Sequence, residues 1–144
     1  MRLFALVGCS AFFCILAGGC SDGSSSKEVA EFEGEWDFVA VEQNGNVWAP
    51  DELKGQRWSI TGDEITATVP GEPNNKMKFK LNASKSPKEM DIMPMYGALK
   101  GRVCPAIYTL ESGRLRVCSS DPGDAKSPRP KAFTDAMIFE KIIR

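Results

Sequence analysis

The segment of residues 104–118 constrains the fold most strongly, because it predicts two strands joined by a tight turn at a Ser-Gly pair. Its Val, Ile, Tyr and Thr residues favour a pleated surface, and Ser-Gly supplies the small residues that a reversal requires. If Leu110 faces Leu115, then Tyr108 faces Val117, and the large apolar side chains share one face of the hairpin. Such a hairpin is typical of an all-β protein.

Alternation of apolar and polar residues predicts the other strands. It is clearest at residues 76–81, where Met77, Phe79 and Leu81 alternate with three lysines, so the apolar side chains face a core and the lysines face water. We expect about eight strands, at residues 35–42, 57–61, 64–69, 76–81, 89–93, 104–110, 114–118 and within 136–143.

Short consecutive strands separated by turns indicate an antiparallel barrel or a sandwich. Asn44-Gly45 is a strong turn signal after the first strand, and residues 50–54 predict one short helical turn. Eight strands can close so that no edge is left exposed, and we therefore expect a small up-and-down barrel rather than a sandwich.

The N-terminus has the pattern of a secretory signal. Met1-Arg2 is followed by an apolar run over residues 3–16 and then by small residues up to Cys20. The apolar run is shorter than the roughly 20 residues that a spanning helix needs. We expect a lipoprotein signal peptide over residues 1–19, a flexible Ser/Gly-rich linker over residues 20–27 and one barrel domain over residues 28–144.

Cys20 follows two glycines, which resembles the bacterial lipoprotein signal in which this cysteine becomes the lipid-modified N-terminus and carries acyl chains such as palmitate. The alternative is ordinary cleavage that leaves a secreted protein with an incidental cysteine. An Asp directly after the lipid-modified cysteine would favour the inner membrane. The residue at that position is Ser21, which favours anchoring to the outer membrane, facing the periplasm or the cell surface.

Composition excludes several functions. The chain has 18 basic and 19 acidic residues, so no basic excess indicates nucleic acid binding. It has no histidine, which rules out catalytic arrangements that use an imidazole base and metal sites built on histidine. Four carboxylates near turns have no spacing that fixes a catalytic pair, and they give only part of a calcium loop: Asp91, Glu111, Asp121 and Asp124. We expect no enzyme activity, no cofactor and no metal.

Two cysteines fall in the domain, Cys104 and Cys118, and an oxidising compartment makes a disulfide the first expectation. The hairpin register argues against it, because the two sulfurs then point to opposite faces with their Cα atoms beyond the limit of about 7 Å for a bridge. A register slip or a bulge would be needed to join them. Without a bridge, Cys104 acts as a small buried apolar residue.

The order of short motifs resembles a lipocalin-like domain family without an assigned activity that is abundant in planctomycete bacteria. The resemblance covers about residues 32–144 and rests on Gly34-x-Trp36, Asp51-Glu52-Leu53-Lys54-Gly55, Ile60-Thr61-Gly62-Asp63, Pro87-Lys88-x-x-Asp91, Gly101 through Ile107-Tyr108-x-Leu110, Leu115-x-Val117-Cys118 and Arg129-Pro130-x-x-Phe133. It implies a lipocalin-like barrel. It also implies that a late arginine, Arg129, lies across the opening Trp36 in a cation–π contact.

Six large side chains are candidates for the barrel interior, either as a filled core or as the lining of a cavity for an apolar ligand: Trp36, Phe38, Trp58, Met77, Phe79 and Tyr108. The leading hypothesis is a lipid-anchored envelope lipoprotein with a binding role, for a small apolar molecule or an envelope protein. The alternative is a structural or protein-interaction module with a solid barrel and no ligand.

Overall fold

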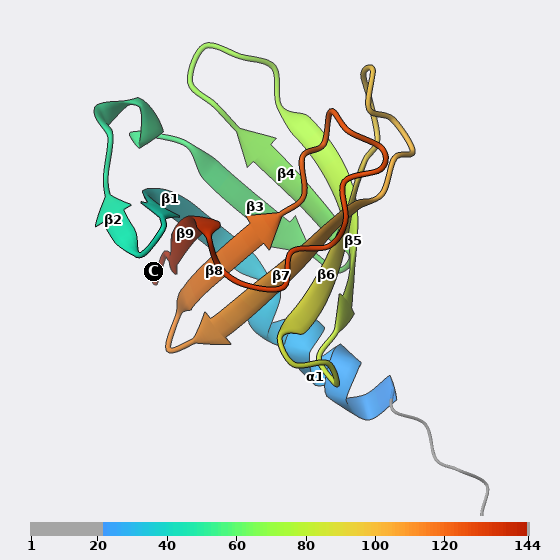
Figure 1. Cartoon of the computed structure of the whole chain (residues 1–144). Coiled ribbons are helices and arrows are strands. Elements are labelled where there is room, and N and C mark those ends of the chain that lie inside the picture. Colours follow the sequence, from blue (N-terminus) through green and yellow to red (C-terminus); the bar gives the residue numbers. More distant parts are fainter. Residues whose placement is uncertain (1–21, 144) are drawn as a thin grey trace, which may run out of the picture.

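The structure is a computed structural model that describes residues 22–143; the predicted signal peptide and Cys20 lie outside these residues. It consists of one helix, one 3-10 turn and nine strands (Figure 1). In chain order these are α1 (Asp22–Phe32), β1 (Gly34–Gln43), β2 (Asn46–Trp48), η1 (Asp51–Leu53), β3 (Arg57–Thr61), β4 (Glu64–Thr68), β5 (Asn75–Asn82), β6 (Lys88–Pro94), β7 (Cys104–Glu111), β8 (Arg114–Ser119) and β9 (Asp135–Lys141).

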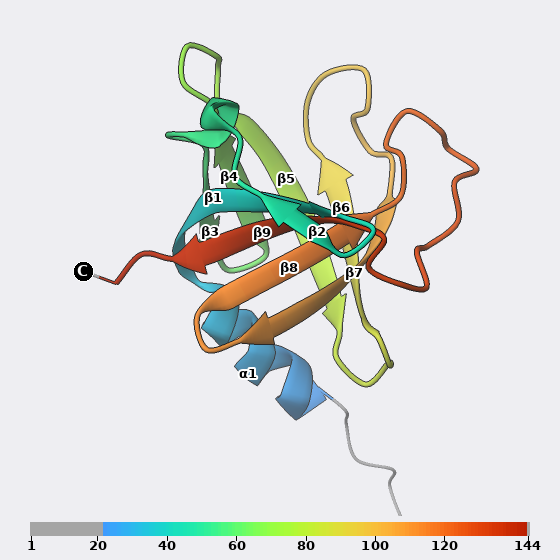
Figure 2. The same cartoon turned by 60° about the vertical axis from the view of Figure 1, so that its left-hand side comes forward.

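Eight of the strands form a closed antiparallel barrel, which confirms the predicted fold class. Each strand from β3 to β9 pairs with its neighbour in the chain, β1 pairs with β3, and β9 returns to pair with β1. Figure 2 shows β9 between β1 and β8, where it closes the barrel. Closure satisfies the backbone groups that an open sheet would leave at its two edges.

β2 is the strand that the sequence analysis missed. Asn44 and Gly45 have φ angles of 48° and 81°, as a tight hairpin turn requires, and the turn pairs Gln43 with Asn46 and Val41 with Trp48. Trp48 therefore lies on a strand. A three-residue segment is too short for alternation to reveal it.

The predicted register of the central hairpin is confirmed: Leu110 pairs with Leu115 and Tyr108 with Val117. Cys104 and Cys118 are free thiols, and both are buried. Cys104 belongs to the core inside the barrel, whereas Cys118 packs with Ile107 on the outer face. The two thiols thus lie on opposite faces of the sheet, as the register predicts.

The core fills the half of the barrel near α1. Trp36, Tyr108, Phe32 and Phe139 are fully buried there. Phe32 stacks on Phe79 with ring centroids 5.8 Å apart and meets Tyr108 edge-on at 5.3 Å. This half of the barrel is solid, and its aromatic contacts add to the free energy gained from burial.

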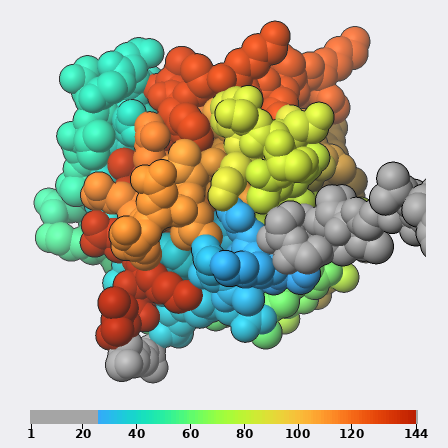
Figure 3. Space-filling model, turned by 90° about the horizontal axis from the view of Figure 1, so that it is seen from below, coloured from blue at the N-terminus to red at the C-terminus, as the bar shows by residue number. Residues whose placement is uncertain are grey.

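The expected flexible linker is wrong from Asp22 onward, because α1 begins there and ends in the core at Phe32. Figure 3 views the molecule from below and shows α1 across the lower end, surrounded by the turns of the barrel strands. The indole Nε1 of Trp36 donates to the Phe32 carbonyl at 2.7 Å. Ser and Gly favour disorder locally, but burial of Phe32 stabilises the helix against that tendency.

The connection between β8 and β9, residues 120–134, crosses the outside of the barrel (Figure 2). Phe133 covers a small outer cluster of Ile107, Cys118 and Ala136. Arg129 donates from Nη1 to the carbonyls of Met90 and Ala106 at 3.1 and 2.8 Å. This connection therefore holds β6 and β7 together from the outside.

The expected pairing of Arg129 with Trp36 is wrong. Arg129 contacts the outer side of β6 and β7, and its Nη2 donates to the carboxylate of Asp91. The cation above the Trp36 ring is instead Lys141, whose Nζ is 5.4 Å from the ring centroid. β9 places Lys141 there because Trp36 and Lys141 are paired in the barrel closure.

Candidate functional site at the upper mouth

The two ends of the barrel differ. α1 covers the lower end, where Lys141 Nζ donates to the carbonyl of Glu31 at 3.0 Å. The last residues of β1 and β8 and the first residue of β9, Gln43, Ser119 and Asp135, lie at the opposite end, which faces the loops. A hollow of 360 Å³ opens to solvent there. We call it the upper mouth; it is lined by Val41, Glu42, Gln43, Trp48, Val117, Ser119, Asp135, Ala136 and Met137.

A bulge in β1 directs Val41 into the upper mouth. β1 pairs Phe38 with Phe139 but Ala40 with Ile138, so one extra residue lies on β1 between these pairs. Phe38 packs against the inner core, and strict alternation from it would turn Val41 outward. The extra residue reverses the alternation, so Val41 pairs with Met137, which also packs against the inner core.

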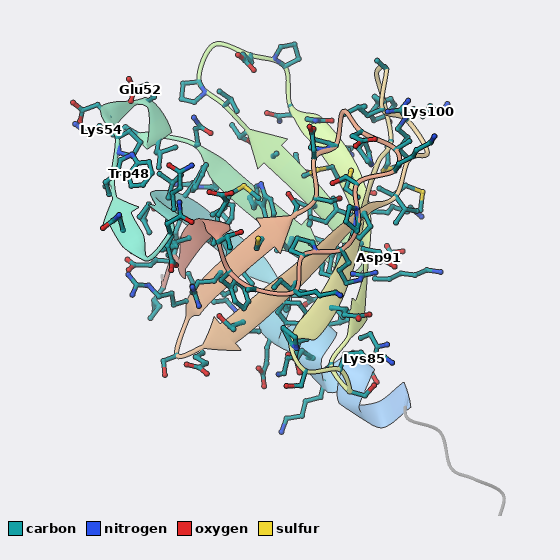
Figure 4. All side chains as sticks on the ribbon, viewed as in Figure 1. Trp48, Glu52, Lys54, Lys85, Asp91 and Lys100 are labelled. Atoms are coloured by element: carbon teal, nitrogen blue, oxygen red, sulfur yellow. The ribbon has the colours of Figure 1, made fainter. Side chains whose placement is uncertain are left out.

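The floor and walls of the upper mouth are apolar. Val117 at the floor is fully buried, and Met137 beside it is half-buried. Trp48 forms one wall and keeps 45% of its surface exposed. Figure 4 shows Trp48 on β2, near Glu52 and Lys54 and on the opposite side of the barrel from Asp91. Gln43, Ser119 and Asp135 supply the polar groups of the rim.

This composition suits a small ligand. Binding pockets are commonly about 300–1,000 Å³ in volume, apolar in their walls, with a few polar groups that orient the ligand. The upper mouth is at the lower end of that range and is open rather than enclosed.

The predicted interior residues lie mainly below this site. Trp36, Trp58, Phe79 and Tyr108 are buried in the inner core, and Phe38 and Met77 pack against it partly buried. They support the upper mouth from below and do not line it. None of the nine residues that line the upper mouth was among the predicted lining residues. The Asn-Gly turn before Val47 and Trp48 was the signal that could have placed Trp48 on a strand.

A partly buried polar contact fixes α1 to the barrel. The hydroxyl of Tyr108 donates to Glu28 Oε1 at 3.0 Å, and Lys88 Nζ donates to the same oxygen at 2.7 Å. Burial raises the pKa of the Tyr108 hydroxyl far above its ordinary value, and the negative charge of Glu28 raises it further. Tyr108 therefore keeps its proton and acts as a hydrogen-bond donor to α1.

The outer surface has other hollows. One of 670 Å³ lies beside the β7–β8 turn and is lined by charged side chains, of which Arg114 and Glu140 form an ion pair at 3.4 Å. Another of 490 Å³ lies between Lys85, Pro87 and the outer connection at Arg129 and Lys131. Both lie on the outside of the barrel, whereas the upper mouth opens over Val117 of the buried inner core.

The four candidate carboxylates do not meet. Asp91 pairs with Arg129, Asp121 and Asp124 accept backbone N–H groups within their own loop, and Glu111 is exposed at the β7–β8 turn. Within residues 22–143, no group of three or more potential ligand side chains could hold a metal ion. In the same part of the chain, no helix is both long and apolar enough to cross a bilayer.

No family model matches this chain, and no curated protein or solved structure matches it. The resemblance to the lipocalin-like family of planctomycetes therefore stays a prediction.

Proposed function

We propose that this protein is a lipid-anchored lipoprotein of the cell envelope whose barrel binds a small apolar molecule, without enzymatic activity. The observation that carries the binding role is the apolar hollow at the upper mouth, with a buried floor at Val117 and a half-exposed Trp48 in its wall. A half-exposed indole beside an apolar floor is a favourable surface for a guest, because a bound guest would remove both from water.

The geometry of α1 fits the anchor. One residue, Ser21, separates the predicted lipid-bearing residue, Cys20, from α1 in the sequence, and α1 covers the lower end of the barrel. A chain anchored at Cys20 would therefore hold its closed end toward the membrane and its upper mouth away from it. The contacts of Phe32, Glu28 and Lys141 keep α1 fixed to the barrel in this arrangement.

The alternative is an interaction module without a small ligand. The solid lower core favours it, as do exposed apolar side chains outside the upper mouth, namely Val47, Tyr96 and Val103, which are 56%, 61% and 53% exposed. A protein partner would dock on such residues by burying them.

The test uses the mature protein with Cys20→Ser, purified under non-denaturing conditions. We expect native mass spectrometry to find a small apolar molecule on part of the population, and a matching probe to raise the melting temperature as its concentration rises. Trp48→Ala should remove both effects, whereas Tyr96→Ala, which changes an exposed aromatic residue outside the hollow, should keep them.

A mass without ligand, together with no thermal shift across a panel of anionic, neutral and cationic amphiphiles, would exclude this function. Capture of an envelope protein that is lost on Tyr96→Ala or Val103→Ala would then support the interaction module.

A further inference from the structure

The upper mouth has an uneven distribution of charge. Among the described residues that line it, two are acidic, Glu42 and Asp135, and none is basic. Glu42 is neutralised, because Arg116 Nε and Nη2 donate to its Oε2 at 3.0 and 2.7 Å. These contacts lie on the outer face, where Arg116 also lies 4.4 Å above the ring of Phe133.

Asp135 differs from Glu42. Within residues 22–143, its carboxylate has neither an ion pair nor a hydrogen-bond partner, and it is exposed at the rim. Its backbone pairs with Gln43, which places its side chain on the same face as Met137 and Val117. The rim of the hollow therefore carries one uncompensated negative charge.

Trp48 lies across β1 from Asp135. Val41 pairs with Trp48 on one side and with Met137 on the other, so the indole and the carboxylate are on opposite sides of β1 and on the same face of the sheet. An aromatic face attracts a cation at short range, and an unpaired carboxylate attracts one over a longer range.

We infer that the upper mouth selects an amphiphile with a cationic head, such as an alkylammonium group, joined to a short apolar body. This inference rests on the proposed binding function and names its ligand class. The body lies on Val117 and Met137, and the head lies between Trp48 and Asp135. The filled core beneath, at Phe139 and Tyr108, limits how far the body can enter.

An anionic head is disfavoured at the same place. It would approach the Asp135 carboxylate with no basic side chain among the described lining residues to compensate it. Fatty acids and anionic detergents should therefore bind more weakly than a cationic amphiphile of equal chain length.

The experiment compares three probes of equal chain length, each below its micelle concentration: octyltrimethylammonium, octanol and octanoate. Calorimetric titration of the mature protein with Cys20→Ser at low salt should give about tenfold tighter binding of octyltrimethylammonium than of octanoate. Added salt should reduce this preference, because the carboxylate is exposed.

Asp135→Asn should reduce the preference to about twofold while keeping octanol binding, because it removes the charge and little volume. Glu111→Gln is the matched control: it removes one exposed negative charge at the lower end and should change nothing. Circular dichroism melts of both variants check that each is folded.

Equal binding of the three probes would overturn the cationic selectivity and leave the binding function standing. Binding of none of them would overturn both. A preference that survives Asp135→Asn would overturn the assignment of Asp135 as its source.

Discussion

Two aromatic side chains at the lower end of the barrel, Tyr108 and Trp36, each have two structural roles. Tyr108 is fully buried, packs against Phe32 and donates its hydroxyl to Glu28. Trp36 is equally buried and donates to the Phe32 carbonyl at 2.7 Å. Each of the two aromatic residues thus fills the core and also donates a hydrogen bond to a polar group of α1. Without that hydrogen bond, burial of the polar group would cost free energy.

Trp36→Ala should lower the free energy of unfolding by about 3–5 kcal/mol, because it leaves a cavity in the core and an unpaired carbonyl at Phe32. Trp48→Ala, at a position that is 45% exposed, should lower it by less than about 1 kcal/mol. Urea denaturation of both variants measures the difference. Comparable losses would contradict the assignment of Trp36 to the core and Trp48 to the rim.

Tyr108 should make the protein sensitive to alkali. Its folded-state pKa is raised above the ordinary value of 10.0, so the unfolded chain loses this proton first as the pH rises. The contribution of the protonated Tyr108 hydroxyl to the free energy of unfolding is fully present below about pH 10 and is lost progressively above it. From pH 8 to pH 11, the urea midpoint of unfolding should fall further for the wild type than for Tyr108→Phe. An identical fall in both proteins would show that Tyr108 is not the cause.

At the scale of elements, β1 is the strand on which the site depends. Its first part pairs with β3, its last part pairs with β2, and most of its length pairs with β9. The bulge after Phe38 lets one strand both fill the lower core and line the upper mouth. β2 is the added element that carries Trp48 to the rim.

Phe32 is the fully buried side chain of α1 and its main apolar contact with the barrel. Phe32→Ala should lower the free energy of unfolding by about 3–4 kcal/mol, and it should raise amide exchange in α1 above that in β7. Glu31→Ala, on the exposed side of the same helix, is the control and should do neither. If α1 stayed protected in Phe32→Ala, another contact would be holding it, with Glu28 to Tyr108 and Lys88 the first to examine.

At the scale of the whole molecule, the closed end and the upper mouth lie at opposite ends of one barrel (Figure 1). α1, the first described element, covers the closed end. An anchor at Cys20 would therefore leave the upper mouth free to meet a ligand or a partner.

Cys20→Ser should block acylation and move the protein from the membrane fraction to the soluble fraction of the cell envelope. The upper mouth lies far from Cys20 in the chain, so ligand binding should survive this change. Fractionation of the cell envelope, with detection of the protein by its mature mass, measures its distribution between the membrane and soluble fractions. Identical fractionation of wild type and variant would contradict the lipid anchor, and Cys9→Ser, within the predicted signal peptide, serves as the control.

Local sequence patterns were sufficient to predict the barrel. Alternation at Met77, Phe79 and Leu81 and the register of Leu110 against Leu115 are local patterns with a period of two, and they fixed which faces are buried. The opposite placement of Cys104 and Cys118 followed from the same register.

The site depends on contacts between residues that are distant in the chain, which local patterns do not reveal. The bulge that turns Val41 inward depends on how β1 fits β9, more than 90 residues later in the chain, and alternation cannot reveal one extra residue. Trp48, Asp135 and Met137 line one hollow only because β2 and β9 both pair with β1. The packing of α1 on Phe79 likewise depends on a long-range contact, that of Phe32. Local propensity is weak beside the burial of a side chain such as Phe32, and that burial becomes possible only once the barrel has closed.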